Sequence, residues 1–161
     1  MTKETIIQRH ILDGVETAGG WGKKMSNTYV SGIPDLLIVY NASGGVGNVQ
    51  APNSTYILEV KKLDALPVRD DDLVKFAHPL TELQHRCLIN INRAGGCAGW
   101  IAIYTKGMVD YIFLGRDKLD IPTKKEFLTK CLTRKRGPAG QSWASIIPLV
   151  LTNLSKLPYH D

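Results

Sequence analysis

Apolar runs bounded by turn-forming residues predict the strands of this chain. A Gly-, Asn-, Ser- and Pro-rich connection at 41–54 separates the first two runs, and this pattern predicts a strand, a loose hairpin loop and a second strand. A third run opens at Trp100, which we expect in the core, and it turns at Lys106-Gly107 into a fourth. The predicted strands are Leu36–Tyr40, Tyr56–Lys62, Trp100–Tyr104 and Met108–Leu114.

Apolar residues at helical spacing predict two helices around the first three strands. The first runs from Lys3 to about Thr17, with Thr2 as its N-cap. A capping box at Thr81 opens the second, which is expected to end at Gly95-Gly96. The predicted core-facing residues are Ile7, Ile11 and Val15 in the first helix, and Leu83, Cys87, Ile91 and Ala94, with Leu88 alongside, in the second.

The last third of the chain predicts two more helices. A capping box at Thr123 opens one, which should end before Gly137-Pro138. The other carries an apolar face that either caps the core or forms a dimer seam, and Pro148 can kink it. The expected buried residues are Phe127, Leu128, Cys131 and Leu132 in the former, and Trp143, Ile146, Ile147, Val150, Leu151, Leu154 and Leu157 in the latter.

Polar residues accompany the first two predicted strands at three positions. Successive side chains of a strand point to opposite faces, so Glu59 and Lys61 share one face while Leu58 and Val60 share the other. Asp35 stands at the mouth of the neighbouring strand. If the two strands pair, one acid from each strand and a lysine converge on one face of the sheet.

Two close carboxylates and a lysine suit metal-assisted hydrolysis. Asp35 and Glu59 would repel each other unless one is protonated or a cation lies between them. A few hard oxygen ligands favour Mg²⁺, which keeps several waters and binds phosphate oxygens. A lysine beside the metal holds or helps deprotonate the attacking water and offsets charge on the phosphoryl group. A Glu-x-Lys strand alone is more often a solvated salt-bridge face, but the apolar neighbourhood of Asp35 favours the metal site.

The order of these motifs resembles the PD-(D/E)XK nuclease superfamily. The likeness is carried by Gly32-Ile33-Pro34-Asp35-Leu36, then Glu59-Val60-Lys61, then a helix with Gln84, and it covers the chain to about Tyr104. Within the superfamily it is most similar to small VRR-NUC and archaeal Holliday-junction-resolvase nucleases. The resemblance implies an α/β fold with a restriction-endonuclease-like α-β-β-β-α-β core, in which a central mixed sheet is flanked by helices. It also implies metal ligands from Asp35, Glu59 and the backbone carbonyl of Val60, with Lys61 as the catalytic lysine.

Two helical residues are candidates to complete the site. Glu4 lies three positions before Ile7 on the core-facing stripe; it either complements the helix dipole or, as in many nucleases of this type, points toward the metal. We prefer Glu4 to Glu16, whose angular position lies off the stripe. Gln84 returns to the N-cap backbone within the capping box or, as the resemblance implies, lies near the metal and holds water or a phosphate, and both can hold in different states of the protein.

Basic residues around these motifs are the candidate contacts to DNA. The segment 18–29 combines glycines, lysines and aromatic residues, and it reads either as a surface loop with ordinary charges or as a DNA-contacting loop that feeds into the metal site. The cluster at 134–136 is either a set of helix-end cations or a phosphate-contact arm. The predicted DNA-binding residues are Lys23, Lys24, Ser31, Lys62, Arg86, Arg134, Lys135 and Arg136.

Composition agrees with this interpretation without demanding it. A chain of 161 residues predicts a single nuclease domain, with its core at about 1–115 and an extension at 123–158. Twenty Lys and Arg against fifteen Asp and Glu give a net charge of +5, which favours a polyanionic partner. The cysteines at 87, 97 and 131 lack metal-type spacing and are expected as reduced thiols. Without a signal peptide or an apolar run long enough for a bilayer, we expect a cytoplasmic protein that is neither secreted nor membrane-bound.

The function that these residues predict is hydrolysis of DNA phosphodiesters with Mg²⁺, for which Mn²⁺ should substitute. By analogy with stand-alone resolvases, we expect a homodimer that cuts branched DNA, such as a Holliday junction in recombination. A site-specific homing or restriction-type endonuclease stays open, as does a non-catalytic DNA-binding module on the nuclease fold. The complete set of Asp35, Glu59 and Lys61 argues against the module, because a protein that only binds DNA does not need a repelling acid pair.

Overall fold

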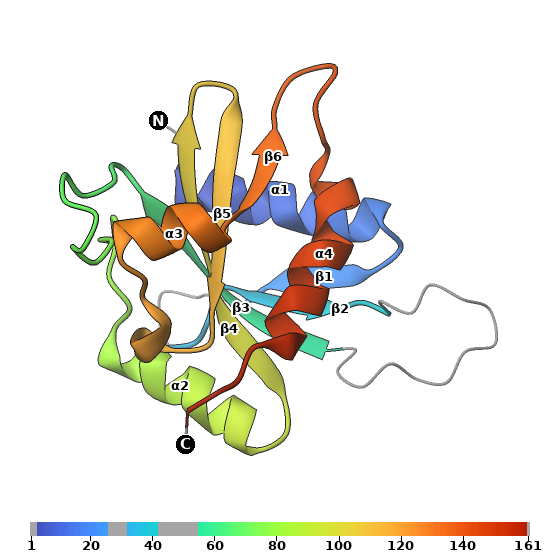
Figure 1. Cartoon of the computed structure of the whole chain (residues 1–161). Coiled ribbons are helices and arrows are strands. Elements are labelled where there is room, and N and C mark those ends of the chain that lie inside the picture. Colours follow the sequence, from blue (N-terminus) through green and yellow to red (C-terminus); the bar gives the residue numbers. More distant parts are fainter. Residues whose placement is uncertain (1–2, 26–31, 42–54, 161) are drawn as a thin grey trace.

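The computed structural model describes residues 3–25, 32–41 and 55–160. In these residues, six strands form one mixed sheet in the order β1-β2-β3-β4-β5-β6, with helices on both faces (Figure 1). β3 and β4 are parallel and are joined by the crossover helix α2, whereas all other neighbouring strands are antiparallel. The elements are α1 (Glu4–Thr17), β1 (Trp21–Lys24), β2 (Leu36–Val39), β3 (Thr55–Leu63), α2 (Glu82–Arg93), β4 (Cys97–Lys106), β5 (Val109–Gly115), the 3₁₀ turn η1 (Lys118–Asp120), α3 (Lys124–Lys130), β6 (Leu132–Lys135) and α4 (Trp143–Lys156).

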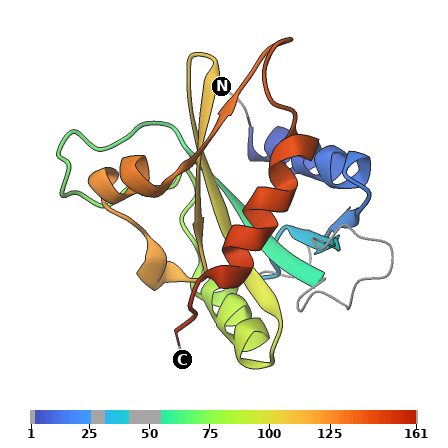
Figure 2. The same ribbon diagram turned by 45° about the vertical axis from the view of Figure 1, so that its right-hand side comes forward.

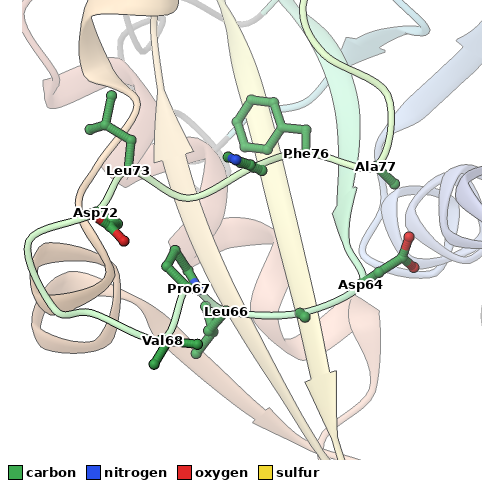
Figure 3. A pocket seen from close by; sticks show the side chains of 10 residues that line it. Asp64, Leu66, Pro67, Val68, Asp72, Leu73, Phe76 and Ala77 are labelled. Carbon is green, nitrogen blue, oxygen red and sulfur yellow. The ribbon is translucent and has the colours of Figure 1, made fainter.

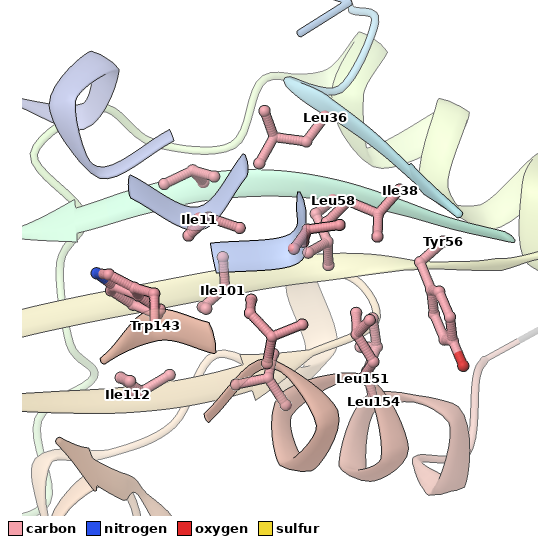
Figure 4. Packing of buried hydrophobic residues seen from close by; sticks show 14 of the residues in the cluster. Ile11, Leu36, Ile38, Tyr56, Leu58, Ile101, Ile112, Trp143, Leu151 and Leu154 are labelled. Carbon is pink, nitrogen blue, oxygen red and sulfur yellow. The ribbon is translucent and has the colours of Figure 1, made fainter. Parts of the chain in front are cut away.

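The side-chain alternation of β3 separates two apolar clusters. Leu58 and Val60 point into the cluster that α1 and α4 cover (Figure 4). Ile57 and Leu63 point into the cluster on the other face, to which α2 and α3 contribute Leu88 and other residues. Glu59 and Lys61 therefore share one face of the sheet, as the sequence predicts, and α2 covers this face.

The apolar face of α4 is covered within the chain. Figure 2 shows α4 lying across the sheet with α1 beside its N-terminal end. Ile147 and Leu151 of α4 are fully buried in the same cluster as Ile11 of α1. Of the two roles that the sequence left open for this face, the structure shows the core role.

Gly14 sets how closely α1 approaches α4. A Cβ added at Gly14 would lie 2.6 Å from the Cβ of Trp143 and 2.9 Å from its backbone carbonyl carbon. An exposed helical Gly→Ala change usually stabilises by about 0.5–1 kcal/mol, but overpacking against backbone costs about 1–3 kcal/mol. We therefore expect Gly14→Ala to lower the free energy of unfolding in urea, with the exposed change Thr17→Ala as a near-neutral control. A Gly14→Ala protein as stable as the wild type would contradict this contact.

β1 corrects the prediction of a loop over 18–29. Trp21–Lys24 form an edge strand in which Lys23 pairs with Leu37 and Lys24 with Leu36 of β2. Trp21 is 54% exposed, and only Gly22 in this strand is half-buried. An edge strand exposed on both faces shows no apolar alternation, so its sequence reads as a loop.

β6 corrects the helix predicted to continue to Gly137. The helix α3 ends at Lys130, and Cys131 has an extended backbone with φ −67° and ψ 149°. The guanidinium of Arg134 on β6 contacts Asp110 of β5 at 2.7 Å and lies 4.8 Å from the centre of the Trp143 ring. These contacts come from segments distant in sequence, and they outweigh the local helical pattern.

The buried side of α2 is rotated from the predicted stripe. Leu88 and Asn92 are buried, whereas Leu83 is 51% exposed and Ala94 is exposed. The other two predicted positions are half-buried. The rotation follows from Asn92, whose amide donates to the carbonyl of Ala98 at 3.0 Å and accepts its N–H at 2.9 Å. A polar side chain that is fully paired can thus occupy a core position.

The three cysteines are free thiols, with Cys97 buried and Cys87 and Cys131 half-buried. Burial is the main cause that raises the pKa of each thiol, which disfavours the reactive thiolate. Within the described part of the chain, no helix combines the length and apolar character that a bilayer crossing requires.

Candidate metal centre

β2 covers only part of one edge of β3. The pairing runs from Val39 opposite Thr55 to Leu36 opposite Leu58, while β4 pairs with the other edge as far as Leu63. In an extended strand the N–H and C=O of a residue point to the same edge. Beyond Leu58, the backbone groups of Val60 and Lys62 therefore face a gap in the ladder. Buried backbone groups need partners, so something else must fill this gap.

Two carboxylates take the place of the missing strand. The Val60 N–H donates to Asp35 Oδ2 at 2.9 Å, and the Lys62 N–H donates to Glu4 Oε1 at 3.2 Å. The Val60 carbonyl faces the same gap, as the strand geometry requires. The gap therefore collects oxygen atoms from α1, from the residue before β2 and from β3.

The position of α1 brings only one of the two candidate glutamates to the gap. Glu4 is half-buried in the first turn and reaches the gap, whereas Glu16 is exposed in the last turn of the helix. The N-cap is Lys3, without a side-chain cap, and the predicted cap Thr2 lies outside the described residues.

Glu59, Lys61 and Gln84 form a buried polar cluster on the α2 side of the gap. Lys61 Nζ lies 2.8 Å from Glu59 Oε1, and the two side chains are only 4% and 2% exposed. Gln84 Nε2 donates to the same oxygen at 2.6 Å. The second oxygen, Glu59 Oε2, is buried without a hydrogen-bond partner among the described residues.

Gln84 serves the capping box and the site in one arrangement. Its Oε1 accepts the Thr81 N–H at 3.0 Å, and its own N–H donates to Thr81 Oγ1 at 3.1 Å. Its amide nitrogen stays available for Glu59. The capping box is therefore confirmed and holds the amide against Glu59, whereas contact of Gln84 with a metal-bound water or a phosphate stays a prediction.

The environment disfavours negative charge on both central acids. The pKa of Glu59 is raised to about 7, first by burial and then by the charge of Asp35, and the Lys61 ammonium opposes this only in part. Burial also raises the pKa of Asp35, although the Val60 N–H and the Lys61 charge favour its ionised form. The Lys61 ammonium, 2.8 Å from Glu59, offsets only part of the cost of a negative charge on this glutamate. A further cation between the two acids would offset the rest.

Gln8 is a site residue that the sequence reasoning missed. It is 5% exposed, its amide donates to the carboxylate of Asp35, and its Oε1 is buried without a partner among the described residues. A signal was present in the sequence, because Gln8 lies one turn after Glu4 and between Ile7 and Ile11 of the buried stripe. A long polar side chain beside a buried stripe is expected to form a hydrogen bond in the interior.

No protein-family model matches the chain, and no curated protein matches it at a significant level. Function must therefore be inferred from the chemistry of the site. Its donors fit a hard divalent cation: Glu59 offers an oxygen that no described residue contacts through a hydrogen bond, Asp35 offers a second carboxylate, and Val60 offers a backbone carbonyl. Mg²⁺ binds proteins through one or two carboxylates and keeps several waters, so two carboxylates and one carbonyl are enough protein ligands for it.

A different group of ligand-type atoms lies near the C-terminus. Asp117, Asp120 and His160 offer atoms within 4.8 Å of one another, and they are the only such group of three in the described ranges. Both aspartates already accept backbone N–H groups, at 2.8 and 2.7 Å, and Asp120 also contacts His160 at 3.2 Å. Hydrogen bonding therefore accounts for this cluster.

Two of the predicted DNA-binding lysines lie near the gap. Lys24 is close enough to Asp35 for its charge to lower the pKa of that carboxyl group. Lys62 points to the sheet face opposite Lys61, and its ammonium contacts Asp64. Arg86 is 70% exposed on α2 and lies 3.7 Å from Glu82.

The other predicted basic residues lie elsewhere. Arg134 lies on β6, three strands from β3 in the sheet, and forms an ion pair with Asp110 of β5. Only 12% of the Arg134 side chain is exposed. Lys135 and Arg136 are exposed at the same edge. Ser31 lies outside the described residues. The structure thus does not bring the 134–136 cluster to the metal centre.

A groove of about 560 Å³ leads away from Glu4, with Lys3, Lys62 and His78 among its lining residues. It shares Asp64 and Ala77 with a larger pocket of about 840 Å³ formed by segment 64–77. Figure 3 shows the larger pocket, whose walls include Leu66, Val68, Leu73 and Phe76. This pocket contains none of the acids at the gap, so the chemistry favours a candidate site at the edge of β3 and not in this larger pocket.

Proposed function

We propose that this chain is a metal-dependent DNA endonuclease with a restriction-endonuclease-like core. The observation that carries the proposal is the buried Glu59 beside Asp35 and Lys61, one oxygen of which has no hydrogen-bond partner in the described part of the chain. The order α1-β1-β2-β3-α2-β4 supports it, because the PD-(D/E)XK resemblance implies the same succession of a helix, three strands, a helix and a strand.

Each residue of the site has a role in this proposal. Asp35, Glu59 and the Val60 carbonyl would hold Mg²⁺ or Mn²⁺, with help from Glu4. The bound cation would supply Lewis-acid activation of the phosphodiester and a lower pKa for its water. Lys61 would hold the attacking water and offset negative charge on the phosphoryl group. Gln84 would fix the orientation of Glu59.

A purely structural role explains this cluster less well. Replacing a buried ion pair by apolar residues of similar size is often neutral or stabilising, so stability alone does not favour Lys61 with Glu59. A buried oxygen such as Glu59 Oε2, which has no hydrogen-bond partner among residues 3–25, 32–41 and 55–160, costs a further ~1–3 kcal/mol. Both costs are expected where a cation and a substrate complete the site.

The surroundings of the site favour a polyanionic substrate. Lys3 and Lys62 line the groove beside Glu4, where Asp64 contacts the Lys62 ammonium, and Lys24 lies near Asp35. The net charge of +5 acts in the same direction. Branched DNA is the proposed substrate. A homodimer would supply one active site for each strand of a junction, and its interface would use surfaces other than the buried face of α4.

The test is cleavage of an end-labelled four-way junction, a linear duplex with the same arm sequence, and single-stranded DNA. We expect paired nicks near the junction centre with Mg²⁺ or Mn²⁺, and none with chelator or with Asp35→Asn. The exposed change Asp71→Asn is the matched control and should leave cleavage intact.

Two other outcomes would change the proposal. Cutting of the linear duplex at one sequence would keep the site and make the protein a site-specific endonuclease. Folded wild-type protein that cuts none of these substrates with either metal would contradict the enzyme and favour the DNA-binding module.

A further inference from the structure

Gln8 brings a buried amide to the metal centre from the middle of α1. The side chain is 5% exposed, and its amide nitrogen donates to Asp35. Its oxygen is buried and accepts no hydrogen bond from the described residues. A methionine would occupy similar space without leaving a buried acceptor unpaired, so packing does not explain the amide.

The orientation of Gln8 follows from its neighbours. Glu4 and Gln8 are four residues apart and therefore lie on the same side of α1. Glu4 accepts the Lys62 N–H at the gap, and Gln8 donates to the carboxylate next to it. The amide nitrogen and oxygen diverge from one carbon atom, so the oxygen turns away from the carboxylate that the nitrogen holds. This oxygen needs a donor, and the waters that Mg²⁺ retains are donors.

We propose that Gln8 is a positioning residue of the metal centre, which holds Asp35 through its amide nitrogen and accepts a hydrogen bond from a cation-bound water at Oε1. This inference rests on the metal-dependent function proposed above. Outer partners of this kind typically change metal affinity or activity by about 10- to 100-fold. A residue of this type acts through the metal ligand and its water and does not touch the reacting atoms.

Binding of Mn²⁺ to the full chain without DNA tests the inference, measured by the loss of the free-ion electron paramagnetic resonance signal. We expect Gln8→Met to bind Mn²⁺ about tenfold more weakly than wild type. Leu12→Met is the control, because Leu12 lies one turn further along α1 and packs against the core. In cleavage assays, saturating Mn²⁺ should restore most of the activity of Gln8→Met, which marks an effect on metal affinity and not on kcat.

A second variant keeps the test decisive if Gln8→Met does not fold. Gln8→Leu removes the same two polar atoms with a smaller apolar side chain, so it should also bind Mn²⁺ about tenfold more weakly than wild type. Wild-type affinity in whichever of the two variants folds would overturn the role of Gln8 alone. Absence of Mn²⁺ binding by the wild type would overturn the proposed function and this inference together.

Discussion

Lys61→Met is expected to lower metal-dependent DNA cleavage by about 10²- to 10⁴-fold while Mn²⁺ binding persists. Lys61 contacts Glu59 at 2.8 Å and is 4% exposed, so methionine can fill its space but supplies no charge. The lysine has no oxygen to offer a hard cation, and its loss should affect chemistry more than metal binding. Single-turnover cleavage rates and Mn²⁺ titration of the same preparation measure the two effects.

Two comparisons make this result specific. Glu59→Gln should lose both cleavage and most of the Mn²⁺ affinity, because it removes a ligand. Lys106→Met, at the exposed turn between β4 and β5, should change neither. Wild-type cleavage by Lys61→Met, or a loss of Mn²⁺ binding equal to that of Glu59→Gln, would be incompatible with the role proposed for this lysine.

The metal-free protein should lose stability as the pH rises from 5 to 8. The folded chain binds a proton at Glu59 with a pKa of about 7, whereas the ordinary value is 4.5. The stabilising contribution of the protonated group is therefore complete below about pH 4.5 and is lost as the pH rises through about 7. At about 1.36 kcal/mol per pH unit between the two pKa values, the loss is roughly 3 kcal/mol. Asp35, whose pKa is also raised, acts in the same direction.

Urea unfolding in chelator at several pH values measures this loss. Glu59→Gln cannot ionise, so the variant should show a much smaller decrease in the free energy of unfolding over the same range. Adding Mn²⁺ should reverse the trend for the wild type, because the cation favours the ionised acids. Identical pH dependence in the wild type and in Glu59→Gln would rule out Glu59 as its source.

The centre proposed here depends on the short length of β2. Because β2 begins only at Leu36, opposite Leu58, it does not reach the Val60 and Lys62 N–H groups of β3, which donate to carboxylates instead. Asp35 and Glu4 are thus anchored by the backbone of β3. Ligand sites on sheet scaffolds are precise for this reason.

Local patterns were sufficient for the central part of this fold. The runs at Leu36–Val39 and Thr55–Leu63 form adjacent strands, and the period of two correctly put Glu59 and Lys61 on one face. The capping box at Thr81 forms as the sequence predicts, because it involves only residues three apart. Such features depend only on residues close together in the sequence, so they form whatever the segment packs against.

Only the tertiary structure decided the rest. The two edge strands, β1 and β6, have no apolar period of their own and exist through pairing with β2 and β5. Arg134 was a candidate for DNA and instead binds Asp110, whereas Gln8 was overlooked and lies against Asp35. The register that leaves the edge of β3 open is set by long-range packing, which no local spacing encodes. The sequence by itself determined which residues can form strands, caps and a shared face, and packing between distant segments determined which of them meet.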